Sequence, residues 1–282
     1  MTVSPLPDVS HSHLDADRIC TLYHRYAADL KRVRDYQRSL YARHVRLRRT
    51  RGVIFRLSGG LLDIGGMGAT HRLHGKSGIV PMDPGLDDIE AEITYLLLRE
   101  QRPARVIEIG ASGGWSTSWI LHALRDNGTG SLHSYDIVDY ALGNLPTDLA
   151  DGRWHFHVGD VRRADLTEPI DYLFIDCDHS REFAEWYLAE LLPTLRPGTP
   201  ISIHDIFHPD YVSRLWNATN NKMGEVSVIR RWLREREIEH FTPSRSWAPD
   251  THRRLAECRR SIGLGADIHY GFANPMVFLR AL

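Results

Sequence analysis

Residues 105–124 read RVIEIGASGGWSTSWILHAL, and this stretch decides the fold. The apolar run at 106–109 is typical of a buried parallel strand. A turn with three glycines follows: Gly110, Gly113 and Gly114. Ser116 or Thr117 can then cap a helix that carries several large apolar residues. The stretch therefore predicts a strand, a glycine turn and a helix, which is the first unit of a nucleotide-binding α/β domain.

The spacing of the glycines, G-x-x-G-G, differs from the G-x-G-x-x-G of dinucleotide sites and disfavours a nicotinamide dehydrogenase. Glu108 stands two residues before Gly110. A carboxylate there would repel a phosphate but suits a ligand with an ammonium group, such as S-adenosylmethionine. An ordinary tight turn of another α/β protein is the alternative that this motif alone leaves open.

Acids follow the next predicted strands, which are 131–137, 154–158, 172–175 and 200–203. Ligands of open α/β sheets bind at the carboxyl ends of the strands. We therefore expect five acids to converge on one crevice: Glu108, Asp136, Asp160, Asp176 and Asp205. Helices are expected over 14–51, 87–100, 180–192 and 224–237, and a last strand over 274–282.

The run at 105–114 resembles motif I of class I methyltransferases. The stretch 170–209 (IDYLFIDCDHSREFAEWYLAELLPTLRPGTPISIHDIFHP) looks like the small class I enzymes that methylate natural products and sugars. Relatives of macrocin O-methyltransferase are the nearest comparison, and catechol-type O-methyltransferases are further away. The resemblance covers about 78–209.

This resemblance implies an α/β fold with a Rossmann-like seven-stranded class I methyltransferase sheet, helices on both faces and an N-terminal helical extension. The expected domains are a helical and lid region at 1–86 and an S-adenosylmethionine-binding methyltransferase domain at 87–282. The segment at 80–86 would close over the methionine end of the cofactor. The glycine-rich stretch at 52–86 is expected to be a surface loop.

The resemblance also implies a cofactor site. Asp136 would accept hydrogen bonds from the ribose hydroxyls, with Asp139 as the alternative, and Asp160 would accept from the adenine amine. The residues expected to bind the cofactor are Glu108, Gly110, Ala111, Ser112, Gly113, Ser116, Asp136, Gly159, Asp160 and Asp176.

A metal site is implied as well, since catechol and caffeoyl-CoA O-methyltransferases bind a divalent metal through two aspartates and use a lysine as base. At the corresponding positions this chain has Asp176, Asp205 and, for the lysine, His179. We expect His179 and Asp176 to be catalytic, because an imidazole with an unperturbed pKa near ~6.5 is a ready base. Where those enzymes continue with a side-chain amide, this chain has Ile206.

In the macrocin-like group an acidic pair ends the fifth strand, and this comparison makes His204 the third metal ligand with Asp176 and Asp205. The alternative for His204 is a histidine of the core or one that supports the metal ligands without binding the metal. The expected cofactors are S-adenosylmethionine and a divalent metal, Mg²⁺ or Mn²⁺. Two carboxylates and an imidazole suit manganese, iron or zinc better than magnesium.

The composition fits an ordinary globular protein: 42% of the 282 residues are hydrophobic, and the net charge is −1. That balance argues against wholesale nucleic-acid binding, and no apolar run reaches the ~20 residues of a membrane helix. Three distant cysteines favour a reducing cytoplasm. We expect a cytoplasmic homo-oligomer that acts on a small molecule.

The expected reaction is methyl transfer to a hydroxyl of a natural product or sugar, as in antibiotic biosynthesis and other secondary metabolism. The alternatives are an N-methyltransferase, a cephalosporin-hydroxylase-like metal enzyme of the same fold, and a degenerate methyltransferase fold that serves as a binding partner.

Overall fold

A computed structural model describes residues 14–57, 82–209, 224–269, 271 and 273–282. Its seven strands are β1 (Arg105–Ile109), β2 (Ser131–Asp136), β3 (Trp154–Val158), β4 (Tyr172–Ile175), β5 (Pro200–Ile203), β6 (His240–Phe241) and β7 (Val277–Arg280). They form one sheet in the order β3-β2-β1-β4-β5-β7-β6. The expected strand positions are thus confirmed to within a few residues, whereas β6 has no counterpart in the sequence prediction.

The first five strands of this sheet run parallel. Strand β7 lies antiparallel between β5 and β6. Ile109 pairs with both Tyr135 and Ile175, so β1, β2 and β4 end at one edge. The expected seven-stranded sheet of class I methyltransferases is therefore confirmed, including the inserted antiparallel strand.

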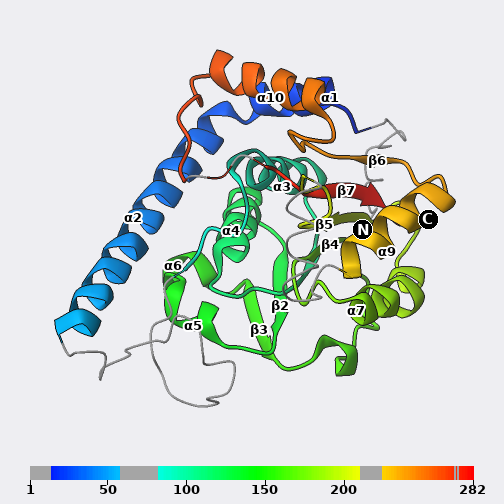
Figure 1. Ribbon diagram of the computed structural model, residues 1–282, viewed down its shortest axis with the longest axis horizontal. Coiled ribbons are helices and arrows are strands. Elements are labelled where there is room, and N and C mark those ends of the chain that lie inside the picture. The colour runs from blue at the N-terminus through cyan, green and yellow to red at the C-terminus, as the bar shows by residue number, and fades with distance from the viewer. Residues whose placement is uncertain (1–13, 58–81, 210–223, 270, 272) are drawn as a thin grey trace, which may run out of the picture.

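The described helices are α1 (Ala16–Arg25), α2 (Ala27–Leu57), α3 (Asp88–Gln101), α4 (Trp115–Asn127), α5 (Tyr140–Asn144), α6 (Thr147–Ala150), α7 (Arg181–Trp186), α9 (Gly224–Glu235) and α10 (Pro249–Ser261). Figure 1 shows α3 and α4 together on one side and α7 beside α9 on the other. Since side chains alternate along a strand, Val106 packs with the α3 and α4 core and Ile107 with the α7 and α9 core. The sheet therefore has one hydrophobic core on each face. None of the described helices has the length and apolarity to cross a membrane.

The two N-terminal helices pack into the first of these cores. Helix α1 lies beside α10 and α3, and α2 extends past α4 (Figure 1). Buried apolar side chains of both helices, among them Tyr23 and Leu30, belong to the same cluster as Trp119 of α4. The N-terminal helices thus complete the sheet's own core and do not form a separate one.

A buried ionic cluster joins these helices to the rest of the chain. Arg34 of α2 pairs with Asp88 at 3.0 Å and also with Glu92, both on α3. Arg259 of α10 reaches Glu92 from the other side, with 2.8 Å between Nε and Oε2. The side chains of Arg34 and Glu92 are fully buried, and that of Arg259 is nearly so. Paired in this way, the charges tie three distant helices together.

Several local expectations need correction. The predicted helix over 14–51 is broken at Tyr26 and runs on to Leu57, so 52–57 is helical and not a loop. Residues 58–81 of the expected loop lie outside the described residues.

The helix predicted over 180–192 is regular only to Trp186 and then passes into a π turn, η2 (Tyr187–Leu191), and a 3₁₀ turn, η3 (Leu192–Thr194). Pro193 in η3 explains the tightened end, because it lacks the N–H that a regular helix needs.

Candidate active site

The glycine turn after β1 is held from two sides. Gly110 has a φ of 89°, and a Cβ on it would lie 1.8 Å from the carbonyl oxygen of Asp176. Asp136 accepts hydrogen bonds through one oxygen from the N–H groups of Ala111, at 2.9 Å, and Ser112, at 2.7 Å. The turn is thereby fixed between the ends of β2 and β4, where the sequence predicts the cofactor.

Glu108 does not face this crevice. Its side chain is fully buried and accepts hydrogen bonds from Ser116, Thr117 and Ser134. Burial raises the pKa of Glu108 to about 7, although the three hydroxyls oppose the shift. The idea that this carboxylate meets a ligand's ammonium group is therefore not supported.

The same contacts correct two expectations about the start of α4. Ser116 and Thr117 were the expected capping residues, but the N-cap position belongs to Gly114. Both hydroxyls donate to Glu108 instead, at 2.7 and 2.8 Å. The expected cofactor residue Ser116 thus points into the protein, because the helix begins two residues earlier than a cap at Ser116 would place it.

Asp160, at the end of β3, is engaged by Arg162. The guanidinium donates to both carboxylate oxygens, with a shortest distance of 2.7 Å. These hydrogen bonds hold the pKa of Asp160 below its usual value. Gly159 precedes it with a φ of 142°, which favours glycine. An adenine amine would have to share Asp160 with Arg162.

Two exposed apolar side chains stand beside these acids and were missed in the sequence. Ile137 directly follows Asp136 and is 69% exposed, and Val158 directly precedes Gly159 and is 63% exposed. They end adjacent strands, since Asp136 pairs with Val158 in the sheet. Exposed apolar residues at two neighbouring strand ends are candidates for contact with an apolar part of a ligand. An apolar residue directly after the acid of the second strand is the signal that could have found them.

Asp176, His179 and Asp205 form a second centre next to the glycine turn. Each offers one ligand atom, and these atoms lie within 4.8 Å of one another. The Nε2 atom of His179 is 3.4 Å from Asp205 and 3.7 Å from Asp176. His179 and Asp205 both have a positive φ, 52° and 60°, which is uncommon for these residues and typical of functional sites.

Glu225, at the start of α9, holds His179 from behind. One oxygen lies 2.8 Å from Nδ1 of His179, and the other accepts from the hydroxyl of Tyr187 at 2.8 Å. Burial opposes protonation of His179, but the hydrogen bond and charge of Glu225, with the charges of Asp205 and Asp176, outweigh it and raise the pKa to about 9.

His204 lies beside both aspartates with which the sequence analysis groups it. It is buried, with Nε2 2.9 Å from Glu90 and Nδ1 3.2 Å from both Asp176 and Asp205. Burial disfavours the charged imidazole, but the three carboxylates outweigh it and raise the pKa of His204 well above its usual value. Both ring nitrogens thus face carboxylates, Nε2 that of Glu90 and Nδ1 those of Asp176 and Asp205. Sequence reasoning missed Glu90 as well as Glu225.

Further side chains surround Asp205. His208 places Nε2 2.7 Å from one oxygen of Asp205, and its own carbonyl accepts from the indole N–H of Trp247 at 2.8 Å. Trp247 is 44% exposed. Cys177 next to the centre is unsuited to nucleophilic attack, because burial and the charges of Glu225 and Asp176 raise the pKa of its thiol.

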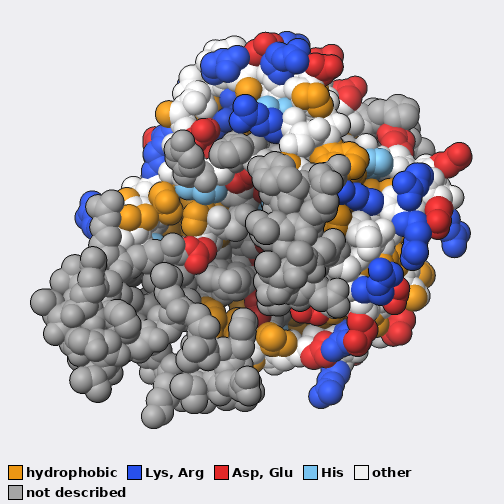
Figure 2. All heavy atoms as spheres, in the orientation of Figure 1, with side chains coloured by type: hydrophobic (Ala, Val, Ile, Leu, Met, Phe, Trp, Pro, Cys, Tyr) orange, Lys and Arg blue, Asp and Glu red, His pale blue; other side chains and the backbone are white. Residues whose placement is uncertain are grey.

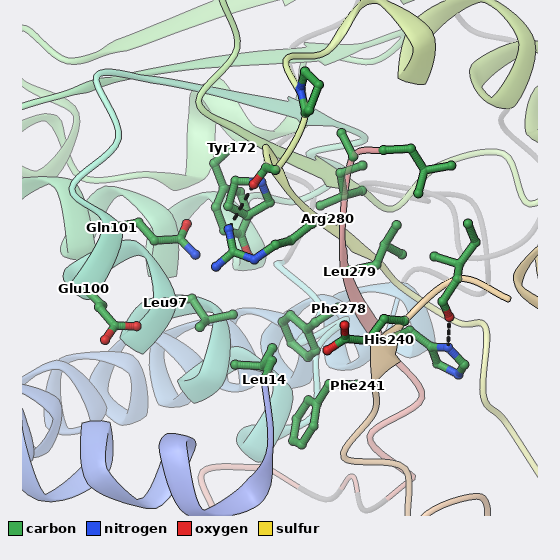
Figure 3. A pocket seen from close by; sticks show the side chains of 18 of the residues that line it. Leu14, Leu97, Glu100, Gln101, Tyr172, His240, Phe241, Phe278, Leu279 and Arg280 are labelled. Carbon is green, nitrogen blue, oxygen red and sulfur yellow. Dashed lines mark hydrogen bonds between the residues drawn. The ribbon is translucent and has the colours of Figure 1, made fainter. Parts of the chain in front are cut away.

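A well-defined cavity lies elsewhere in the described part of the chain. It has a volume of about 390 Å³ and opens where β4 and β5 begin, lined by Leu97, Tyr172, Phe278 and Arg280 among others (Figure 3). None of the described residues that line it is a predicted site residue. On the face shown in Figure 2, acidic and basic side chains are interspersed, in line with the net charge of −1.

The sheet order, the glycine turn and the acids at the strand ends are those of the class I methyltransferase fold. Residues 107–206 match the family model described as "Methyltransferase domain". This match runs from β1 to the residue after Asp205, so it contains both the glycine turn and the centre of Asp176, His179 and Asp205.

The chain is similar to several solved methyltransferases. It is 16% identical to the O-methyltransferase TomG from Streptomyces achromogenes, over 73% of this chain and 83% of that one, with a TM-score of 0.44. It is 15% identical to an O-methyltransferase from Bacillus cereus, over 86% and 91%, with a TM-score of 0.47. It is 12% identical to the Podospora anserina methyltransferase PaMTH1, over 86% and 94%, with a TM-score of 0.43. No curated protein matches the chain in sequence.

Proposed function

We propose that this enzyme transfers the methyl group of S-adenosylmethionine to a hydroxyl of a small molecule, such as a natural product or a sugar, with help from a divalent metal. The observation that carries the proposal is the contact of Gly110 with Asp176, which places the glycine turn and the acidic centre side by side. A methyl donor in the turn and a hydroxyl at the centre would then be close enough for an in-line displacement.

The residues present fit the cofactor. A carboxylate has about four acceptor positions. Asp136 uses three of them, for the N–H groups of Ala111, Ser112 and Val138, which leaves one for a ribose hydroxyl. Ile137 and Val158 would line the adenine. Bound S-adenosylmethionine supplies a methyl group that is activated by the sulfonium charge.

The segment before α3 supports the expected closure over the cofactor. Met82 donates its N–H to His44 of α2 at 3.0 Å, and its Cα would lie 3.0 Å from a Cβ on Gly113. A Cβ on Gly85 would lie 3.8 Å from a carboxylate oxygen of Asp176. Residues 82–86 thus run between the glycine turn and the acidic centre. On this basis we retain 1–86 as the helical and lid region and 87–282 as the methyltransferase domain.

The donor set fits a metal. Two carboxylates and an imidazole within 4.8 Å suit manganese, iron or zinc. A bound divalent metal would lower the pKa of an acceptor hydroxyl, which makes it a better nucleophile. Asp176 would hold the metal at the edge that it shares with the glycine turn, and Asp205 would hold it from β5. The non-haem iron oxygenases use two histidines and one carboxylate, whereas the donor set within 4.8 Å here has two carboxylates and one imidazole.

We further propose that the enzyme is a cytoplasmic homo-oligomer. The three cysteines Cys20, Cys177 and Cys258 are free thiols, which supports a reducing compartment. The length of α2, 31 residues, supports contact with a second copy.

Calorimetric titration with S-adenosylmethionine and S-adenosylhomocysteine tests the cofactor site. We expect micromolar binding by the wild type, a large loss in Asp136→Ala, and no change in Asp139→Ala, which removes a neighbouring acid without a side-chain cap bond. Hydroxylated acceptors are then screened with and without Mn²⁺. A folded wild-type protein that binds neither compound would contradict the proposed function.

A further inference from the structure

We propose that His179 is the third metal ligand and that Glu225 is the residue that positions it. The inference rests on the proposed function, because that function supplies the metal. It differs from the sequence expectation, in which His179 was the base and His204 the ligand. It also assigns a role to α9, which lies outside the matched domain at 107–206.

The two nitrogens of His179 have separate tasks. Nδ1 lies 2.8 Å from Glu225, and Nε2 faces Asp205 and Asp176 at 3.4 and 3.7 Å. Histidine ligands of metals usually donate their second N–H to a carboxylate or a carbonyl, which fixes the ring and makes the ligating nitrogen more basic. The carboxylate of Glu225 meets that requirement.

Glu225 is itself held rigidly. Its side chain is 2% exposed, and its second oxygen accepts from Tyr187. Its backbone N–H donates to the carbonyl oxygen of His179 at 3.1 Å. A Cβ on Gly224 would lie 2.6 Å from the backbone nitrogen of Arg181, so α9 begins in close contact with the chain at 179–181. The ring of His179 is therefore fixed by backbone and side chain together.

Neither neighbouring histidine fits the role as well. His204 has Nε2 on Glu90 and Nδ1 3.2 Å from both aspartates, but the donor atoms that lie within 4.8 Å of one another belong to Asp176, His179 and Asp205. His208 contacts only Asp205 among the three residues of the centre. With His179 as ligand, the site has one nitrogen and two carboxylate donors, and we expect it to prefer Mn²⁺, Co²⁺ or Zn²⁺ to Mg²⁺.

The test uses the full chain after chelation and measures Mn²⁺ binding, so it does not depend on activity. Electron paramagnetic resonance gives the affinity from free Mn²⁺, and its pulsed form detects a coordinated imidazole nitrogen. We expect Glu225→Gln, which keeps the shape, to bind Mn²⁺ roughly 10- to 100-fold more weakly. Glu185→Gln on α7 is the matched control, since it removes an exposed glutamate, and it should bind as the wild type does.

His179→Asn should lose the imidazole nitrogen signal while His208→Asn keeps it. His179→Gly adds a second reading, because glycine accepts the φ of 52° and leaves space into which free imidazole can bind. Added imidazole should restore Mn²⁺ affinity in that variant. Circular dichroism confirms that each variant is folded.

A nitrogen signal that survives in His179→Asn would overturn the proposal, as would a Glu225→Gln variant that binds Mn²⁺ like the wild type. Failure of the folded wild type to bind Mn²⁺, Co²⁺ or Zn²⁺ would overturn it too. Each of these results is separate from the cofactor titration, so the methyltransferase function and the ligand assignment fail independently.

Discussion

Gly110 lies directly against the backbone of Asp176, so that a Cβ at this position would be 1.8 Å from the carbonyl oxygen. This contact brings the turn after β1 to the end of β4. The identity of residue 110 thus controls the distance between the cofactor turn and the acidic centre.

We predict that Gly110→Ala destabilises the protein by at least about 3 kcal/mol, because the added methyl group meets rigid backbone at a positive φ. Chemical unfolding followed by circular dichroism measures the change. Gly143→Ala is the matched control, since nothing lies within 4 Å of its Cβ position, and it should be neutral. Equal stability of the two variants would show that β4 can move aside.

Glu108 should make stability depend on pH. The pKa of Glu108 is raised from 4.5 to about 7 in the folded protein. Its contribution to the free energy of unfolding is therefore full below about pH 4.5 and is lost as the pH rises through 7. Replacement by glutamine should remove up to about 3 kcal/mol of this dependence. Unfolding curves of wild type and Glu108→Gln between pH 4.5 and 8 test this, with the exposed Glu168→Gln as control. Parallel curves would contradict a raised pKa.

Removal of the metal should separate binding from catalysis. After exhaustive chelation we expect methyl transfer to a hydroxyl to fall by at least about tenfold, because the acceptor loses the charge that lowers its pKa. Binding of S-adenosylmethionine should remain, and Mn²⁺ should restore the rate. Full activity in the chelated enzyme would exclude a role for the metal in catalysis.

The apolar lining at the ends of β2 and β3 gives a further prediction. Ile137→Ala should weaken S-adenosylhomocysteine binding by about 1 kcal/mol, or roughly fivefold, with little change in stability because the side chain is exposed. Leu142→Ala removes a different exposed apolar side chain, one on α5, and this variant should bind S-adenosylhomocysteine normally. Calorimetry compares the two, and equal losses would argue against a specific contact.

Arg259 carries a prediction about stability. Its removal leaves Glu92 and Asp88 short of a buried positive partner, which typically costs about 3–5 kcal/mol. Thermal unfolding of Arg259→Met measures the loss. Arg253→Met, which removes an exposed arginine of the same helix, should change stability by less than about 0.5 kcal/mol. A small loss at Arg259 would mean that Arg34, together with His269 beside Asp88, balances the acids.

Much of the sheet could be predicted from the sequence, because buried parallel strands are short apolar runs followed by polar residues. The proximity of Asp176 and Asp205 could also be predicted from the sequence, since the ends of neighbouring parallel strands meet at one edge of the sheet. Glu108 shows where this reasoning is insufficient. Side-chain alternation along β1 places Glu108 on the same face as Val106, under α4. Its side chain therefore points into the core, although the residue is only two positions before the glycine turn.

The partners of the site could not be predicted. Glu225 and Glu90 meet His179 and His204 across 46 and 114 residues, and each is one acid among many on a helix. Nothing local marks them. Only the packing of α9 and α3 on the sheet brings them to the centre, where Glu225 raises the pKa of His179 and Glu90 adds to the effect of Asp205 and Asp176 on the pKa of His204.

The ionic cluster has a consequence for how the chain is made. Arg34 precedes Asp88 by 54 residues, whereas Arg259 follows Asp88 by 171. A chain that grows on the ribosome therefore holds Asp88 and Glu92 with a single cationic partner until α10 has been synthesised. Closure of the cluster is a late event, and it couples completion of the polypeptide to the locking of its first helices.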